Sequence, residues 1–105
     1  MADKTNARPL ARLSDALTYG NIWLSALSLM KKKKVYAYVL PDEIERKFGF
    51  RPSKLMTYFV LYKLETDGFV SAKFEGRRKY YELTKSGRGM LEEGKKLLAK
   101  TAKKL

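Results

Sequence analysis

The most constraining feature of the sequence is a three-residue connection between two predicted helices. Gly49, Phe50 and Arg51 separate Phe48 from Pro52. Because Pro52 keeps the residue before it out of the helical region, the chain must turn sharply here. Two helices joined by so short a turn are typical of a helix-turn-helix.

The residues on either side of this turn fit helices. Pro41 opens the first helix, and apolar residues follow at four-residue spacing up to its end at Gly49. Ser53 is a natural N-cap for the second helix over residues 54–66, and Gly68 supplies a left-handed stop after it. For this second helix the spacing predicts one side made of Leu55, Tyr58, Leu61, Leu64 and Glu65.

Further elements are predicted on both sides of this pair. We expect a short amphipathic helix at residues 9–18 and, after a cap at Asn21, a buried central helix at 22–31. A very short strand follows at 35–40. A β-hairpin has strands at 69–74 and 79–83 joined by 75–78, and Thr84 caps a last helix that runs to Leu105.

This order predicts an α+β, mainly helical fold: a winged helix-turn-helix with an added N-terminal helix and a C-terminal dimerisation helix. We expect one domain over residues 1–105, with an N-terminal helix at 8–18, a winged-helix core at 21–84 and the dimerisation helix at 85–105. Residues 1–7 are read as a polar, frayed arm.

Charge and missing residue types limit the function. The chain carries 23 Lys and Arg against 11 Asp and Glu, a net charge of +12, and contains no His or Cys. Zinc, thiol and imidazole chemistry therefore lack their groups, and we expect no enzyme, no catalytic or metal site and no cofactor. The absence of Cys fits a cytoplasmic protein. No apolar run is long enough to span a membrane, and the last helix lacks the large aromatic residues that anchor interfacial helices, so we expect no membrane partner.

The positive charge predicts a polyanionic partner, which could be DNA, RNA or an anionic membrane surface, and the order of helices and hairpin favours double-stranded DNA among them. A helix fits the major groove, and a projecting hairpin reaches the backbone or minor groove beside it. The residues expected to contact DNA lie in the turn, in the helix after it and at the hairpin tip: Arg51, Ser53, Lys54, Thr57, Arg77, Arg78 and Lys79.

Two leucine stripes predict a homodimer. Leu91, Leu98 and Leu105 recur every seven residues in the last helix, and Leu10, Leu13 and Leu17 line one face of the first. A small core cannot obviously cover both stripes, so we expect them to form a twofold interface. The alternative is a monomer in which the last helix folds back on the first.

The hairpin sequence resembles that of the PadR-like winged-helix transcriptional regulators. The similar strings are RRKYYELTKSGR at residues 77–88 and LETDGFV at 64–70, and the resemblance spans residues 21–91. This sequence departs from the family at Ala37, where Gly is usual, and at Pro41. The resemblance implies a DNA-binding transcriptional regulator and, in some relatives, a flat aromatic effector near the dimer interface.

The leading prediction is a sequence-specific, dimeric transcriptional regulator. Two alternatives stay open: a non-specific architectural DNA-binding protein, and a winged-helix module for protein–protein interaction that uses Phe59 and Tyr62. The apolar Met56, Phe59 and Tyr62 either pack beneath the N-terminal helix and the hairpin or form an exposed partner surface. Trp23 is expected in the core.

Overall fold

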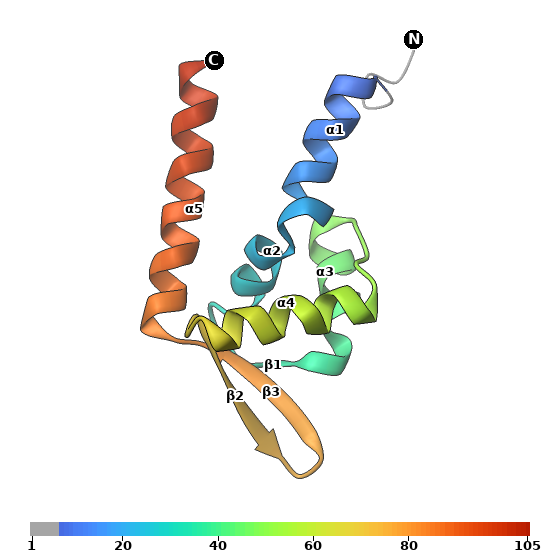
Figure 1. Cartoon of the computed structure of the whole chain (residues 1–105), viewed down its shortest axis with the longest axis vertical. Coiled ribbons are helices and arrows are strands. Elements are labelled where there is room, and N and C mark those ends of the chain that lie inside the picture. Colours follow the sequence, from blue (N-terminus) through green and yellow to red (C-terminus); the bar gives the residue numbers. More distant parts are fainter. Residues whose placement is uncertain (1–6) are drawn as a thin grey trace.

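The structure, a computed structural model, describes residues 7–105, so the predicted arm lies outside the described residues except for Ala7. The molecule is elongated, measuring 52 × 26 × 21 Å. A hairpin projects from one end of a helical body, and the first and last helices project from the other end (Figure 1).

The order of elements is the predicted one. The helices are α1 (Arg8–Leu17), α2 (Ile22–Leu29), α3 (Leu40–Phe48), α4 (Lys54–Thr66) and α5 (Lys85–Lys104); the strands are β1 (Val35–Tyr36), β2 (Val70–Glu75) and β3 (Arg78–Leu83); and 3₁₀ turns lie at Tyr19–Asn21 and Ala37–Val39. The predicted mainly helical α+β class and its winged helix-turn-helix are confirmed. The central helix is shorter than predicted because residues 30–34, which include four lysines, form a loop, and the first strand is shorter because a 3₁₀ turn begins at Ala37.

The three strands form an antiparallel sheet in the order β1-β3-β2. β3 pairs with β2 along its whole length, from Val70 opposite Leu83 to Glu75 opposite Arg78. Gly76 has φ +64° at the first of the two connecting residues, as a type II′ hairpin turn requires. β1 pairs with β3 only through Val35 and Tyr36, so the tip of the hairpin extends beyond β1.

The core lies around α2. Leu27 on α2, Leu40 and Ile44 on α3 and Leu61 on α4 are fully buried. Gly49 ends α3 in the left-handed conformation, with φ +79°, and so allows the short turn into α4. The α3–α4 pair is thus fixed on α2, and the opposite side of α4 stays free.

Asn21 occupies the N-cap position of α2 as predicted, but its side chain makes no cap hydrogen bond to the helix. Instead Nδ2 donates to the Ala16 carbonyl at 2.5 Å, and Oδ1 accepts from the indole Nε1 of Trp23 at 3.1 Å. Asn21 therefore joins α1 to α2 and orients Trp23, which is partly buried against the core as expected.

The predicted apolar side of α4 is also wrong in part. Leu61 and Leu64 are buried as expected, but the third buried residue of the helix is Thr57. Leu55 and Tyr58 are exposed instead. Within the described part of the chain, no helix is both long and apolar enough to cross a bilayer.

Candidate nucleic-acid interface

The first turn of α4 is fixed by its cap. The Ser53 hydroxyl accepts a hydrogen bond from the Met56 amide at 3.1 Å, as the sequence predicted. Lys54 is exposed, and its ammonium lies 4.2 Å from the centre of the Tyr38 ring. Ser53 and Lys54 therefore lie at the exposed N-terminal end of this helix, the end that approaches base edges in helix-turn-helix proteins.

Thr57 does not share this position, which corrects the prediction that it contacts DNA. Its exposed fraction is 1%. The hydroxyl donates to the Ser53 carbonyl at 2.8 Å, and the side chain packs toward the core. Thr57 lies on the same buried helical face as Leu61, four residues later. It therefore helps to pack α4 against the core and is inaccessible to a ligand.

The outward face of α4 is apolar. Leu55 is 81% exposed, Phe59 62% and Tyr62 65%. Met56 is also about half exposed. Of the two arrangements that the sequence left open for Met56, Phe59 and Tyr62, the structure shows the exposed one.

The tip of the hairpin is basic and free. Arg77 and Arg78 are exposed, and among residues 7–105 neither forms an ion pair. The Arg78 guanidinium lies 5.2 Å from the centre of the Tyr36 ring, a cation–π contact that keeps the aliphatic part of the Arg78 side chain along the sheet. Both guanidinium groups are therefore available to phosphate oxygens.

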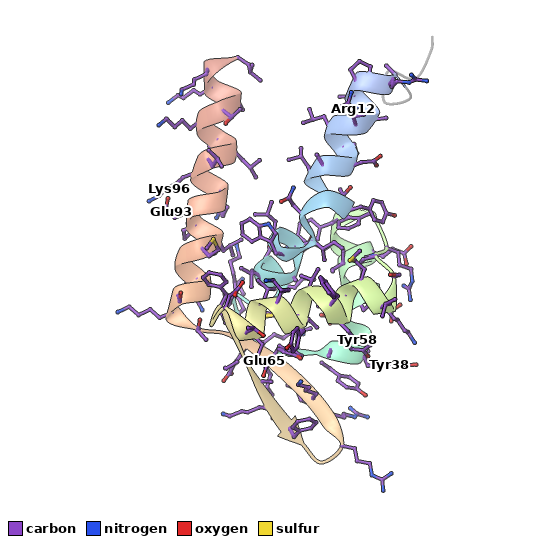
Figure 2. All side chains as sticks on the ribbon, viewed as in Figure 1. Arg12, Tyr38, Tyr58, Glu65, Glu93 and Lys96 are labelled. Carbon is purple, nitrogen blue, oxygen red and sulfur yellow. The ribbon has the colours of Figure 1, made fainter. Side chains whose placement is uncertain are left out.

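A groove of about 340 Å³ separates α4 from the hairpin. Figure 2 shows two of its residues, Tyr38 and Tyr58, at the same end of α4. The groove is lined mostly by tyrosines and two basic residues: Tyr36, Ala37, Tyr38, Tyr58, Tyr62, Arg77, Lys79 and Tyr81. It joins the exposed side of α4 to the basic hairpin, so both border one continuous surface.

Sequence reasoning missed Tyr36, Tyr38 and Tyr58 as groove residues, although it named Tyr62 as a candidate surface residue. Tyr58 and Tyr62 are four residues apart, which places them on one helical face. Tyr36 and Tyr38 alternate with Ala37 in the short strand region. The number of tyrosines in the sequence is a signal of an aromatic surface. Only the fold shows that Tyr58 and Tyr62 lie on the side of α4 that borders the groove.

Arg51 and Lys79, two other residues predicted to contact DNA, form ion pairs with carboxylates. Arg51 lies 2.5 Å from Asp42 and 3.1 Å from Glu45, and hydrogen bonds to these two groups raise its pKa above the usual value. The Lys79 ammonium lies 3.7 Å from Glu65. A hydrogen bond to Tyr81, followed by the pairing with Glu65, raises the pKa of Lys79. Both cations stay charged, but each exchanges a partner if it binds phosphate.

The predicted dimer residues fall into two groups. Leu10, Leu13 and Leu17 are exposed, as are Leu98 and Leu105. The prediction that Leu91 lies in the dimer interface is wrong. Its exposed fraction is 2%, because it belongs to the core cluster of this same chain. No residue of α1 is buried, so α5 does not fold back on it within the described chain.

Comparisons with known proteins agree with this arrangement. The model of the transcriptional regulator PadR-like family matches residues 26–93, from α2 to the middle of α5. The fold is similar to that of a PadR family transcription regulator from Clostridium difficile, with 24% identity, 80% of this chain and 93% of that chain covered, and a TM-score of 0.74. No curated protein sequence matches significantly.

Two further solved structures are similar. One is Bacillus subtilis PadR in complex with operator DNA, with 24% identity, 69% of this chain and 44% of that chain covered, and a TM-score of 0.60. The other is a winged-helix DNA-binding protein from STIV, with 22% identity, coverage of 79% and 88%, and a TM-score of 0.68. At these identities the likeness concerns the fold.

Proposed function

The chain belongs to the PadR-like family of winged-helix transcriptional regulators, and from this premise we propose that it binds double-stranded DNA sequence-specifically as a homodimer. α4 enters the major groove, and the β2–β3 hairpin contacts the backbone or the minor groove. Residues 1–105 act as one domain, with 8–18 as the N-terminal helix, 21–84 as the winged-helix core and 85–105 as the dimerisation helix.

The observation that carries the proposal is the shared surface of α4 and the hairpin. Ser53 and Lys54 lie at the exposed end of α4, and the free Arg77 and Arg78 lie on the hairpin across the tyrosine-lined groove. Phosphate contacts position a protein on the duplex, and contacts to base edges give specificity. Arg51 and Lys79 are secondary contacts in this proposal, since each first leaves a carboxylate.

A similar protein and the net charge both support double-stranded DNA as the partner. Bacillus subtilis PadR was solved in complex with operator DNA, and its fold resembles that of this chain. The net charge of +12 favours the same polyanion here. Family membership and charge together support double-stranded DNA over an uncharged or basic partner.

Dimerisation is argued from uncovered leucines. α1 and α5 extend from the body at the end opposite the hairpin (Figure 1). Their exposed leucines are Leu10, Leu13 and Leu17 on α1, Leu97 and Leu98 on α5, and Leu105 directly after α5. A twofold interface would bury both sets and hold two copies of α4 for half-sites about 34 Å apart.

We place the small aromatic effector implied by the resemblance in a groove beside this interface. The groove has a volume of about 560 Å³. Its lining is largely apolar and includes Leu17, Leu24, Phe48, Phe50 and Leu98, with Lys31 and Lys95 as cations. An aromatic ligand bound there would touch residues of the proposed dimer interface and of the core at once.

A protein–protein interaction module stays the second candidate, because Phe59 and Tyr62 are exposed on α4. A non-specific architectural protein would use the same charges without preferring a sequence. We assign no enzymatic activity, since the family is one of regulators and the chain has no His or Cys. A cytoplasmic location is proposed with the regulatory function.

The test is selection of bound fragments from genomic DNA, with the molecular mass of the protein measured in solution. We expect enriched fragments that share an inverted repeat, and a mass of twice 12.1 kDa. Fragments that share no motif would favour the architectural alternative. DNA binding that is unaffected by removal of the hairpin arginines would favour the interaction module.

A further inference from the structure

Apart from Lys54 and Lys63, α4 lacks the side chains that most often read bases. Arg and Lys read guanine, and Asn and Gln read adenine, through paired hydrogen bonds in the major groove. The α4 sequence KLMTYFVLYKLET contains no Arg, Asn or Gln. The ammonium of Lys54, in its first turn, lies over the Tyr38 ring at 4.2 Å. The most exposed large hydrophobic side chain of this turn is Leu55, which is 81% exposed.

An exposed leucine at this place has one apolar group available to it in the major groove. The 5-methyl group of thymine projects there, and apolar side chains recognise thymine through it. On the basis of the function proposed above, we propose that Leu55 reads a thymine through this methyl group. Each half-site then carries an A·T pair beneath the first turn of α4.

The surroundings of Leu55 favour DNA over a protein partner. Lys54 precedes it, and Arg77 and Lys79 line the neighbouring groove on the hairpin side. Lys63, near the other end of α4, is exposed as well. A basic border around a small apolar contact matches a duplex, whose phosphates flank the methyl groups of the groove.

The assignment to Leu55 follows from position on the helix. Phe59 lies one turn further along the same face, and Tyr62 nearly two turns further. In helix-turn-helix proteins the N-terminal residues of the reading helix contact base edges. Leu55 is therefore the apolar residue of this face that approaches the bases first.

The experiment uses the full chain and the duplex enriched in the genomic selection. Each thymine of the duplex is replaced in turn by deoxyuridine, which pairs identically but lacks the 5-methyl group. We expect one position in each half-site where this change weakens binding about fourfold per methyl group, the factor expected for one buried carbon. Leu55→Ala should weaken binding to the thymine duplex by a similar factor and bind both duplexes equally.

Met56→Ala is the matched control, because Met56 is an exposed apolar residue of the same turn that points about 100° away. This variant should keep the preference for thymine. The inference is overturned if no thymine is sensitive to removal of its methyl group, or if Leu55→Ala keeps the wild-type preference. Sequence preference without methyl sensitivity would overturn the inference and leave the proposed function intact. Equal binding to all duplexes would overturn both.

Discussion

At the scale of single residues, the hairpin arginines are the simplest of the proposed DNA contacts to test. Arg77 and Arg78 are exposed and form no ion pair within residues 7–105. Replacing both by Ala should lower DNA affinity severalfold without lowering the free energy of unfolding. The slope of log affinity against log salt should also become shallower, by about one unit for each phosphate group that the variant no longer binds.

The control for this pair removes the same charge elsewhere. Lys103 and Lys104 lie in the last turn of α5, at the end opposite the hairpin (Figure 1). Replacing both by Ala should change affinity and salt slope much less. Equal decreases in affinity in the two double variants would show that only net charge matters and that the hairpin does not touch DNA.

Thr57 and Lys54 form a second test, since they are three residues apart on α4 with opposite expected effects. Thr57→Ala removes buried atoms and should lower the free energy of unfolding by about 1–2 kcal/mol, without changing the DNA affinity of the folded protein. Lys54→Ala should leave the free energy of unfolding within about 0.5 kcal/mol and weaken DNA binding. Urea unfolding and DNA titration check both; a change of sequence preference in Thr57→Ala would contradict its burial.

The same residues show where sequence reasoning failed. Leu61 and Leu64 fit a helical stripe with Leu55 and Tyr58, and they fit another with Thr57. Periodicity predicts the helix and its N-cap at Ser53, but both stripes satisfy it. The positions of α2 and α3 decide between them, because these helices cover the face that contains Thr57. Burial of a threonine in place of a leucine is a tertiary effect.

At the scale of elements, the start of α5 depends on its close approach to the chain before the hairpin. A Cβ atom on Gly87 would lie 1.9 Å from the Phe69 carbonyl oxygen, whereas a Cβ on Gly89 would meet nothing within 4 Å. Gly87→Ala should therefore lower the free energy of unfolding by about 3 kcal/mol. Gly89→Ala, in the same helix, should raise it by up to about 1 kcal/mol. Similar effects of the two changes, measured by urea unfolding, would contradict this packing.

The C-terminal half of α5 differs from the N-terminal half, which packs on the core. Leu91 is in the core, and a Cβ on Gly94 would meet Trp23 and Leu24 at 2.9 Å, so α5 packs on α2 up to this point. A chain that ends at Lys96 should therefore stay folded but become monomeric, because it lacks Leu98 and Leu105. Light scattering gives the mass, and thermal unfolding reports the fold. A truncated chain that stays fully dimeric would show that α5 is not the interface.

The sequence alone could not divide α5 in this way. The seven-residue spacing of Leu91, Leu98 and Leu105 predicts one continuous stripe. The structure divides it, since α2 covers the first leucine and nothing within the described chain covers the last. The hairpin was predicted more closely, because Glu75-Gly76-Arg77-Arg78 combines turn chemistry with flanking β-branched and aromatic residues.

At the scale of the whole molecule, charge alone predicts some DNA binding. A net charge of +12 attracts any duplex, and this attraction weakens steeply as salt rises. Affinity for one DNA at low salt therefore does not separate a regulator from an architectural protein. The quantity that distinguishes them is the ratio of the affinities for the specific site and for an unrelated sequence at the same salt concentration.

The most direct measurement is a competition titration at physiological salt. The full chain is bound to the duplex enriched from genomic DNA and displaced either by the same duplex or by a scrambled duplex of equal length and composition. Our account predicts that the scrambled duplex competes about a thousandfold less well, or worse, with two protomers bound per inverted repeat. Competition by both duplexes within a fewfold of each other would contradict sequence-specific regulation by this protein.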